Sequence, residues 1–159
     1  MTKNPYRGKF IVFEGIDGSG QSTQAGLLHK FLSKRGRLVV LTKEPTQDSR
    51  AGRKIRKILD KKEKTSSQRL QQLFADDRKE HLKKTVIPAL KQGKTVISDR
   101  YFFSSLAFGT ADGVDLNWLI RINKAFLVLD FNLSIFFSSF SITKPIKDGS
   151  IFGNETTEV

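Results

Sequence analysis

The chain has 159 residues and a formal net charge of +12, from 28 lysines and arginines against 16 aspartates and glutamates. This length fits one domain with a core of its own. Apolar residues make up 38% of the chain, with 13 phenylalanines, which excludes a largely disordered protein. The absence of cysteine excludes a disulfide scaffold, a cysteine nucleophile and a cysteine-ligated zinc site, and two histidines make a histidine-rich metal site improbable.

The positive charge is concentrated in the first part of the chain. Residues 1–100 hold 24 basic and 10 acidic side chains, a balance of +14, whereas residues 101–159 have a balance of −2. A basic block followed by a near-neutral remainder indicates a local site for anions and not a general coat for nucleic acid.

Neither a signal peptide nor a membrane span is predicted. The N-terminus is polar and basic, without an apolar segment before a cleavage site. The most apolar stretch, 125–142, contains Asp130, Asn132 and four serines, which favours a buried strand over a bilayer segment. We therefore expect a cytoplasmic protein with no membrane partner.

The first 41 residues predict a strand, a loop, a helix and a second strand. The apolar runs 10–13 and 38–41 are typical of buried strands. Between them, apolar residues recur at helical spacing from Leu27 to Leu32, and Gly36 marks the end of the helix. This order favours a parallel sheet.

More helices and strands are predicted downstream. Asp48 or Ser49 caps a helix whose basic face is solvated. Ser66 or Ser67 begins a longer helix, which Pro88 kinks. The remaining predicted elements are a strand at 95–98, short helices at 104–108 and 116–124, and a strand at 133–137.

The glycine-rich loop between the first strand and helix nearly matches the phosphate-binding pattern G-x-x-x-x-G-K-[ST]. Small residues let backbone N–H groups converge on a phosphate, the start of the helix adds positive potential, and the Ser22 hydroxyl suits Mg²⁺. The alternative interpretation is a turn without a ligand. The predicted ATP-phosphate-binding residues are Gly15, Gly18, Ser19, Gly20, Gln21, Ser22 and Thr23.

Gln21 occupies the position that the pattern gives to lysine. A charge-assisted hydrogen bond contributes about 1.5–3 kcal/mol against about 1 kcal/mol for a neutral one. The expected loss in binding is about tenfold, and larger if the charge acts mainly in the transition state. Phosphate binding should survive, and the chemistry should weaken unless another cation substitutes.

Four motifs, in this order, resemble the thymidylate kinase family, which phosphorylates dTMP with ATP. The resemblance covers about residues 9–137. The motifs are Phe13-Glu14-Gly15-Ile16-Asp17-Gly18 with Ser22-Thr23-Gln24, then Glu44-Pro45-Thr46, then Phe74-Ala75-Asp76-Asp77-Arg78, and finally Asp99-Arg100-Tyr101 with Ser104 and Phe108.

The resemblance implies a role for each matching residue. Phe74 would stack on thymine, Arg78 would bond the base edge, and Arg100 would grip the dTMP phosphate. The implied catalytic residues are Asp17, Asp99 and Arg100, and Ser22 and Asp99 would hold Mg²⁺. The implied dTMP-binding residues are Glu44, Pro45, Phe74, Arg78, Arg100, Ser104 and Phe108.

Each of these residues also has a purely structural interpretation. Phe74 and Phe108 are candidates for the core, and Arg78 for a solvated helix charge. Asp99 and Arg100 are candidates for a surface ion pair. They follow a predicted parallel strand directly, however, and α/β sheets place ligand groups there.

The predicted fold class is α/β, a P-loop NTPase-type parallel sheet flanked by helices. Residues 1–8 form an N-terminal extension, 9–137 the kinase-like domain and 138–159 an atypical tail. Past Phe137 the likeness stops, and no arginine follows Arg121, so the lid and the last strand of the family are not recognisable. This pattern indicates a truncated or frame-shifted C-terminus.

Three functions follow from the sequence. The leading one is ATP-dependent phosphorylation of dTMP to dTDP, with Mg²⁺, and a homodimer is expected from the family. The second is a nucleotide-binding relic with little transfer, suggested by Gln21 and the absent lid. The third is a basic nucleic-acid-binding module, which the sequence disfavours because aromatic residues do not interleave with the basic runs.

Overall fold

The computed structural model describes residues 5–126 and 133–137, so the predicted tail at 138–159 lies outside the described residues. The strands are β1 (Lys9–Gly15), β2 (Val39–Lys43), β3 (Thr95–Asp99) and β4 (Leu133–Phe137). The helices are α1 (Gln21–Lys34), α2 (Arg50–Leu59), α3 (Ser67–His81), α4 (Ile87–Lys91), α5 (Phe102–Ala111) and α6 (Leu116–Asn123). A π-helical turn (Leu82–Val86) joins α3 to α4, and a 3₁₀ turn (Lys124–Phe126) follows α6.

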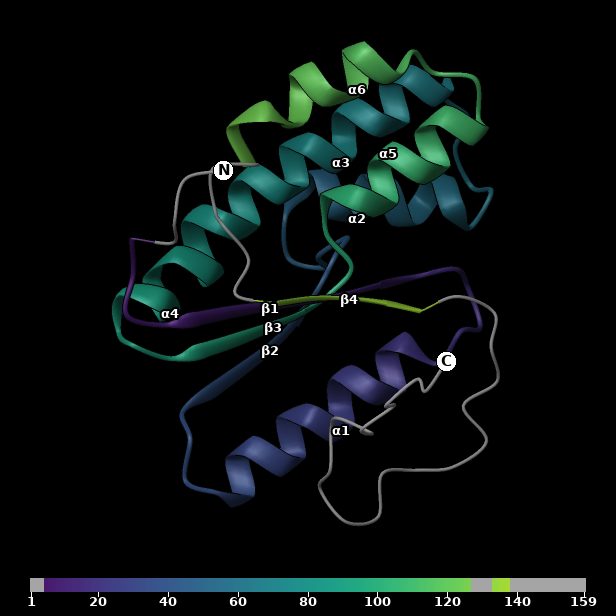
Figure 1. Cartoon of the computed structure of the whole chain (residues 1–159). Coiled ribbons are helices and arrows are strands. Elements are labelled where there is room, and N and C mark those ends of the chain that lie inside the picture. The colour runs from purple at the N-terminus through teal and green to yellow at the C-terminus, as the bar shows by residue number, and fades with distance from the viewer. Residues whose placement is uncertain (1–4, 127–132, 138–159) are drawn as a thin grey trace, which may run out of the picture.

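The four strands form one parallel sheet in the order β2-β3-β1-β4. Figure 1 shows α1 on one face of the sheet and the other helices gathered on the opposite face. The predicted α/β fold with a parallel sheet is therefore confirmed. Because all strands run the same way, their carboxyl ends lie along one side of the sheet, called the carboxyl edge below. The last residues of β1, β2 and β3 there are Gly15, Lys43 and Asp99.

Alternating residues of β1 pack into two separate cores. Phe10 and Val12 face the helices that follow β2, in a cluster with Leu90 and Tyr101. Phe13 faces the other way and packs with Ala25 of α1. Burial on both faces explains why β1 is a continuous apolar run in the sequence.

The second strand differs from its prediction. Leu38 is 66% exposed and Leu41 is 43% exposed, so the prediction of a buried strand was wrong. The reason is the strand order, which places β2 at the edge of the sheet beside β3 alone. An edge strand has a neighbour on one side only, and its side chains are covered less completely.

The long helical stretch after Ser66 is interrupted one turn earlier than predicted. The irregularity is the π-helical turn at Leu82–Val86, and Pro88 lies in the first turn of α4. Proline has no N–H to donate to the carbonyl four residues before it, and a widened turn accommodates that loss. Within the part of the chain that the structure describes, no helix has both the length and the apolarity needed to cross a bilayer.

Candidate functional site

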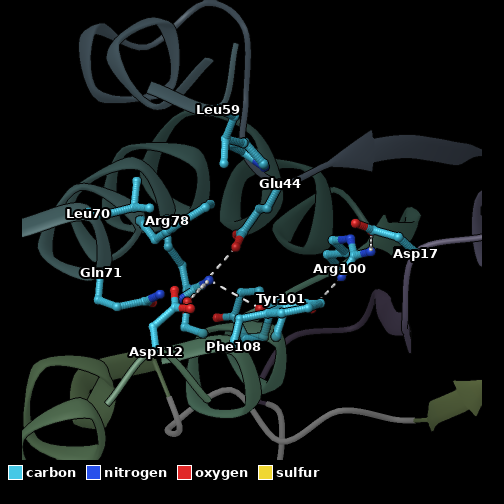
Figure 2. A pocket seen from close by; sticks show the side chains of 14 residues that line it. Asp17, Glu44, Leu59, Leu70, Gln71, Arg78, Arg100, Tyr101, Phe108 and Asp112 are labelled. Atoms are coloured by element: carbon cyan, nitrogen blue, oxygen red, sulfur yellow. Dashed lines mark hydrogen bonds and ion pairs between the residues drawn. The ribbon is translucent and has the colours of Figure 1, made fainter. Parts of the chain in front are cut away.

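A pocket with a volume of about 240 Å³ opens beside the carboxyl edge of the sheet. All seven residues predicted to bind dTMP line it, together with Asp17 of the glycine loop. In Figure 2, Gln71 and Arg78 lie at one end of the labelled side chains, and Arg100 and Asp17 lie at the other. The lining residues are Asp17, Glu44, Pro45, Leu59, Leu70, Gln71, Phe74, Arg78, Arg100, Tyr101, Ser104, Ser105, Phe108 and Asp112.

Arg100 is held at the end of the pocket nearest the glycine loop. Its backbone has a φ of 74°, a conformation uncommon outside glycine, and its N–H donates to the carbonyl of Phe13 at 2.8 Å. Its guanidinium donates to Ser104 Oγ at 3.1 Å and forms an ion pair with Asp17 at 2.5 Å. The guanidinium also lies 5.4 Å from the centre of the Phe108 ring. Strained backbone of this kind persists where surrounding contacts hold it, often at functional sites.

Glu14, which the sequence analysis did not select as a site residue, holds the segment around Arg100. It is buried, and it accepts hydrogen bonds from the backbone N–H of Tyr101 at 3.0 Å and from Ser104 Oγ at 2.5 Å. Burial raises the pKa of the Glu14 carboxyl above its usual value, although these hydrogen bonds act in the opposite direction. The signals in the sequence were an acid directly after the apolar run 10–13 and its place in the first family motif.

Arg78 is almost fully buried, with 1% of its surface exposed, so its interpretation as a solvated helix charge was wrong. Its Nε donates to Glu44 at 2.7 Å, and one Nη donates to Asn123 at 2.5 Å. The other Nη donates to the carbonyl of Tyr101 at 3.1 Å and to Ser105 Oγ at 3.2 Å. These bonds use four of its five N–H groups and leave one for a ligand.

Glu44 is the counter-ion of Arg78 and is itself shared. His81 Nδ1 lies 2.9 Å from the second oxygen of Glu44, and His81 Nε2 lies 2.7 Å from the hydroxyl of Thr42. The carboxylate is buried and bonded on both oxygens. Glu44 therefore orients Arg78 through one oxygen and contacts His81 through the other.

A second buried acid, Asp77, shapes the segment after Glu44. Its carboxylate accepts from the backbone N–H of Thr46 at 2.8 Å and from the hydroxyls of Thr46 and Ser49, each at 2.5 Å. Ser49 in turn caps α2 by accepting from the N–H of Gly52. These bonds fix the loop that carries Pro45 into the pocket wall.

Two aromatic residues of the pocket, Phe74 and Phe108, lie outside the buried core. Phe74 is half-buried, Phe108 is 42% exposed, and both line the pocket, so the core interpretation of Phe108 was wrong. Gln71, which the sequence analysis passed over, is 2% exposed and lines the same pocket. Its Oε1 has no hydrogen-bond partner among the described residues. A buried carbonyl without a partner is costly, and a ligand N–H would satisfy it.

Two glycines of the glycine loop have a left-handed backbone. Gly18 and Gly20 have φ values of 80° and 85°, which are unfavourable for residues with a Cβ. Gly20 caps α1, and Ser22 and Thr23 lie in its first turn. The start of a 14-residue helix without a side-chain cap has backbone N–H groups that suit an anion.

Asp99, at the end of β3, meets the first turn of α1. Ser22 Oγ donates to its Oδ2 at 2.6 Å, and Gln21 Nε2 donates to its Oδ1 at 3.0 Å. Lys43 Nζ lies 2.9 Å from the same Oδ2. A hydroxyl and a carboxylate oxygen are ligands that Mg²⁺ accepts, with water and phosphate completing its shell, so Ser22 and Asp99 fit a magnesium ion.

Three comparisons with known proteins find the same family. A family model described as thymidylate kinase matches residues 13–143. A probable thymidylate kinase of Pyrococcus horikoshii is 54% identical over 123 residues, which cover 74% of this chain and 60% of that protein. A thymidylate kinase of Caldicellulosiruptor saccharolyticus is 44% identical over 122 residues, which cover 76% of this chain and 59% of that protein.

The fold comparison extends the match to a solved structure. The crystal structure of thymidylate kinase from Ehrlichia chaffeensis superposes with a TM-score of 0.70 at 33% identity, covering 86% of this chain and 75% of the other. The chain spans about 60% of the length of the curated relatives named above.

Proposed function

Because the chain belongs to the thymidylate kinase family, we propose that it transfers the γ-phosphoryl group of ATP to dTMP, giving dTDP and ADP. One observation carries the proposal: Asp17 of the glycine loop pairs with Arg100 at the end of the pocket. This contact joins a loop suited to a triphosphate to a pocket suited to a nucleoside monophosphate. The phosphates of the two ligands would therefore meet there.

The proposed reaction depends mainly on positioning and charge. An oxygen of the dTMP phosphate attacks the γ-phosphorus, and the bond to the β,γ-bridging oxygen breaks, so ADP leaves with that electron pair. Arg100 would hold the dTMP phosphate in place of its present pairing with Asp17. The N–H groups of residues 18–22 would hold the ATP phosphates. Ser22 and Asp99 would hold Mg²⁺, which neutralises developing charge on the phosphates when bound.

The opposite end of the pocket suits a thymine ring. Phe74 offers an aromatic surface, Arg78 has one remaining N–H, and Gln71 Oε1 is an unpartnered acceptor within the described residues. Thymine presents a carbonyl acceptor beside the N3–H donor, which complements this pair. Cytosine has an unprotonated N3, which would face the Gln71 carbonyl with two acceptors and no proton.

A coupled assay of ADP release with dTMP, dUMP, CMP and AMP tests the proposal. We expect the highest kcat/KM with dTMP, a value lower by about tenfold with dUMP, which lacks one methyl group, and lower values with the other two. ATP alone gives the hydrolysis background. A preference for CMP or AMP would show that dTMP is not the substrate. Binding of ATP and dTMP without release of ADP would support the alternative function, a nucleotide-binding relic.

The domain limits, the compartment and the assembly belong to the same proposal. We infer a unit at 9–137, a cytoplasmic protein and a homodimer. The exposed apolar side chains of Leu116 and Ile120, four residues apart on α6, support self-association. Sedimentation equilibrium would give the mass of the assembly.

A further inference from the structure

The glycine loop carries a glutamine at its lysine position, and the structure shows where that amide goes. Gln21 is 4% exposed, and its Nε2 donates to Asp99 Oδ1 at 3.0 Å. Its Oε1 is buried and has no partner in the described part of the chain. The amide is therefore buried against Asp99, and as a neutral group it brings no positive charge to a phosphate.

Lys43 brings an ammonium group to the same place from a different strand. It is the last residue of β2 and pairs in register with Asp99 of β3. Its Nζ lies 2.9 Å from Asp99 Oδ2 and donates to Ser22 Oγ at 3.4 Å. Ser22 lies in the first turn of α1, directly after Gln21. The ammonium therefore lies beside the hydroxyl that a bound triphosphate would approach.

Half of the Lys43 side chain, 53%, remains exposed. A lysine with a flexible four-carbon stem can exchange its carboxylate partner for phosphate oxygens without movement of the backbone. Asp99 itself is only 6% exposed, but it keeps the hydrogen bonds from Gln21 and Ser22 when the ammonium turns away, so its carboxylate is not left without donors.

We propose that Lys43 takes the place of the loop lysine of the general pattern. Its ammonium group would bring the positive charge to the terminal phosphates of the bound triphosphate. This proposal rests on the triphosphate-binding part of the proposed function. It makes Lys43 a binding and catalytic residue. A purely structural role would be limited to balancing the charge of Asp99, and the two roles predict different nucleotide affinities.

Isothermal titration of the full chain with Mg²⁺ and ATP, ADP or AMP separates the two roles. We expect Lys43→Met to weaken ATP binding about tenfold or more, because a charge-assisted bond is lost, and to change AMP binding less than twofold. Lys43→Arg, which retains the charge, should recover most of the affinity for ATP. Lys54→Met is the matched control, because Lys54 is 52% exposed and pairs only loosely, at 3.9 Å, with Glu63.

Restoring the loop lysine gives an independent measurement. If Lys43 carries the missing charge, Gln21→Lys should rescue ATP binding strongly in the Lys43→Met chain and improve it less in the parent chain. Such non-additivity indicates that both lysines act on one group. Thermal unfolding of each variant identifies any loss that comes from a damaged fold.

Two results would overturn the proposal for Lys43 alone: ATP binding that Lys43→Met leaves unchanged, or equal losses for ATP and AMP. A parent chain that binds no ATP would overturn this inference together with the proposed function. A parent chain that binds ATP in a Lys43-dependent way but transfers nothing to dTMP would overturn only the dTMP kinase activity and would support the role of Lys43 in triphosphate binding.

Discussion

The pocket has an arginine at each end, and their surroundings are opposite. Arg78 is 1% exposed and bonds a glutamate that is 3% exposed. Arg100 is 15% exposed and pairs with Asp17, which is 92% exposed. Both are arginine–carboxylate pairs that line one cavity, but only the Arg100–Asp17 pair can separate at a small cost in free energy. A buried pair whose partner is removed leaves an uncompensated charge, whereas an exposed pair exchanges with water or with another anion.

This difference assigns the two arginines different tasks. Arg78 ties α3 to Asn123 of α6 and to the segment after β3, so it builds the pocket and presents one remaining N–H. Among the described residues, the guanidinium of Arg100 bonds the half-buried Ser104 and the exposed Asp17, so it can turn its charge to a phosphate. Substitutions at the two positions should therefore separate stability from substrate binding.

The largest effect is expected from Arg78→Met. Removing the guanidinium leaves Glu44 buried with His81 as its remaining partner and removes bonds to Asn123, Tyr101 and Ser105. We expect the free energy of unfolding to fall by about 3–5 kcal/mol, measured by urea denaturation. Arg69→Met, on the exposed face of α3, is the control and should change it by less than about 0.5 kcal/mol.

An Arg78→Met chain as stable as the Arg69→Met chain would show that the buried network contributes nothing to the fold, and the contrast between the two arginines would be wrong.

Arg100→Met should have a smaller effect, and on binding. The lost pair with the exposed Asp17 should lower the free energy of unfolding by no more than about 1 kcal/mol. If Arg100 binds the dTMP phosphate as proposed, the loss of this charged donor should weaken dTMP binding by about tenfold to a hundredfold. Titration calorimetry with dTMP measures this loss, and Arg100→Lys should recover part of it. Destabilisation as large as that of Arg78→Met would contradict the assignment.

The sequence predicts the parts of this molecule that depend on neighbouring residues. Ser49 and Ser66 cap their helices, and the turn glycines Gly18 and Gly20 adopt positive φ, as local chemistry requires. The position of β2 at the sheet edge depends on strand order, which no local pattern encodes, and so the exposure of Leu41 was missed.

The contacts of the site residues were equally out of reach. The guanidinium of Arg78 bonds residues 23 to 45 positions away, and Gln21 bonds Asp99 across 78 positions. The family resemblance implied which residues gather at the carboxyl edge but not which of them neutralise one another. That distinction decides which charges remain for the ligand, and only the fold supplies it.

The smallest effect is expected at Glu14, which holds the segment around Arg100 through hydrogen bonds from Tyr101 and Ser104. Burial raises its pKa above the usual 4.5, so as the pH rises the unfolded chain loses this proton before the folded chain does. The contribution of Glu14 to stability is therefore fullest below pH 4.5 and declines as the pH rises through the folded-state pKa.

Glu14→Gln removes the titration and keeps the shape, because the Ser104 hydroxyl can accept from the new amide. Urea denaturation between pH 4 and pH 7 should show the parent chain losing stability relative to Glu14→Gln as the pH rises. The opposite result is a difference in the free energy of unfolding that stays constant with pH or grows in favour of the parent chain. It would mean that the surroundings of Arg100 stabilise the charged form of Glu14, and the expected direction of its pKa shift would be wrong.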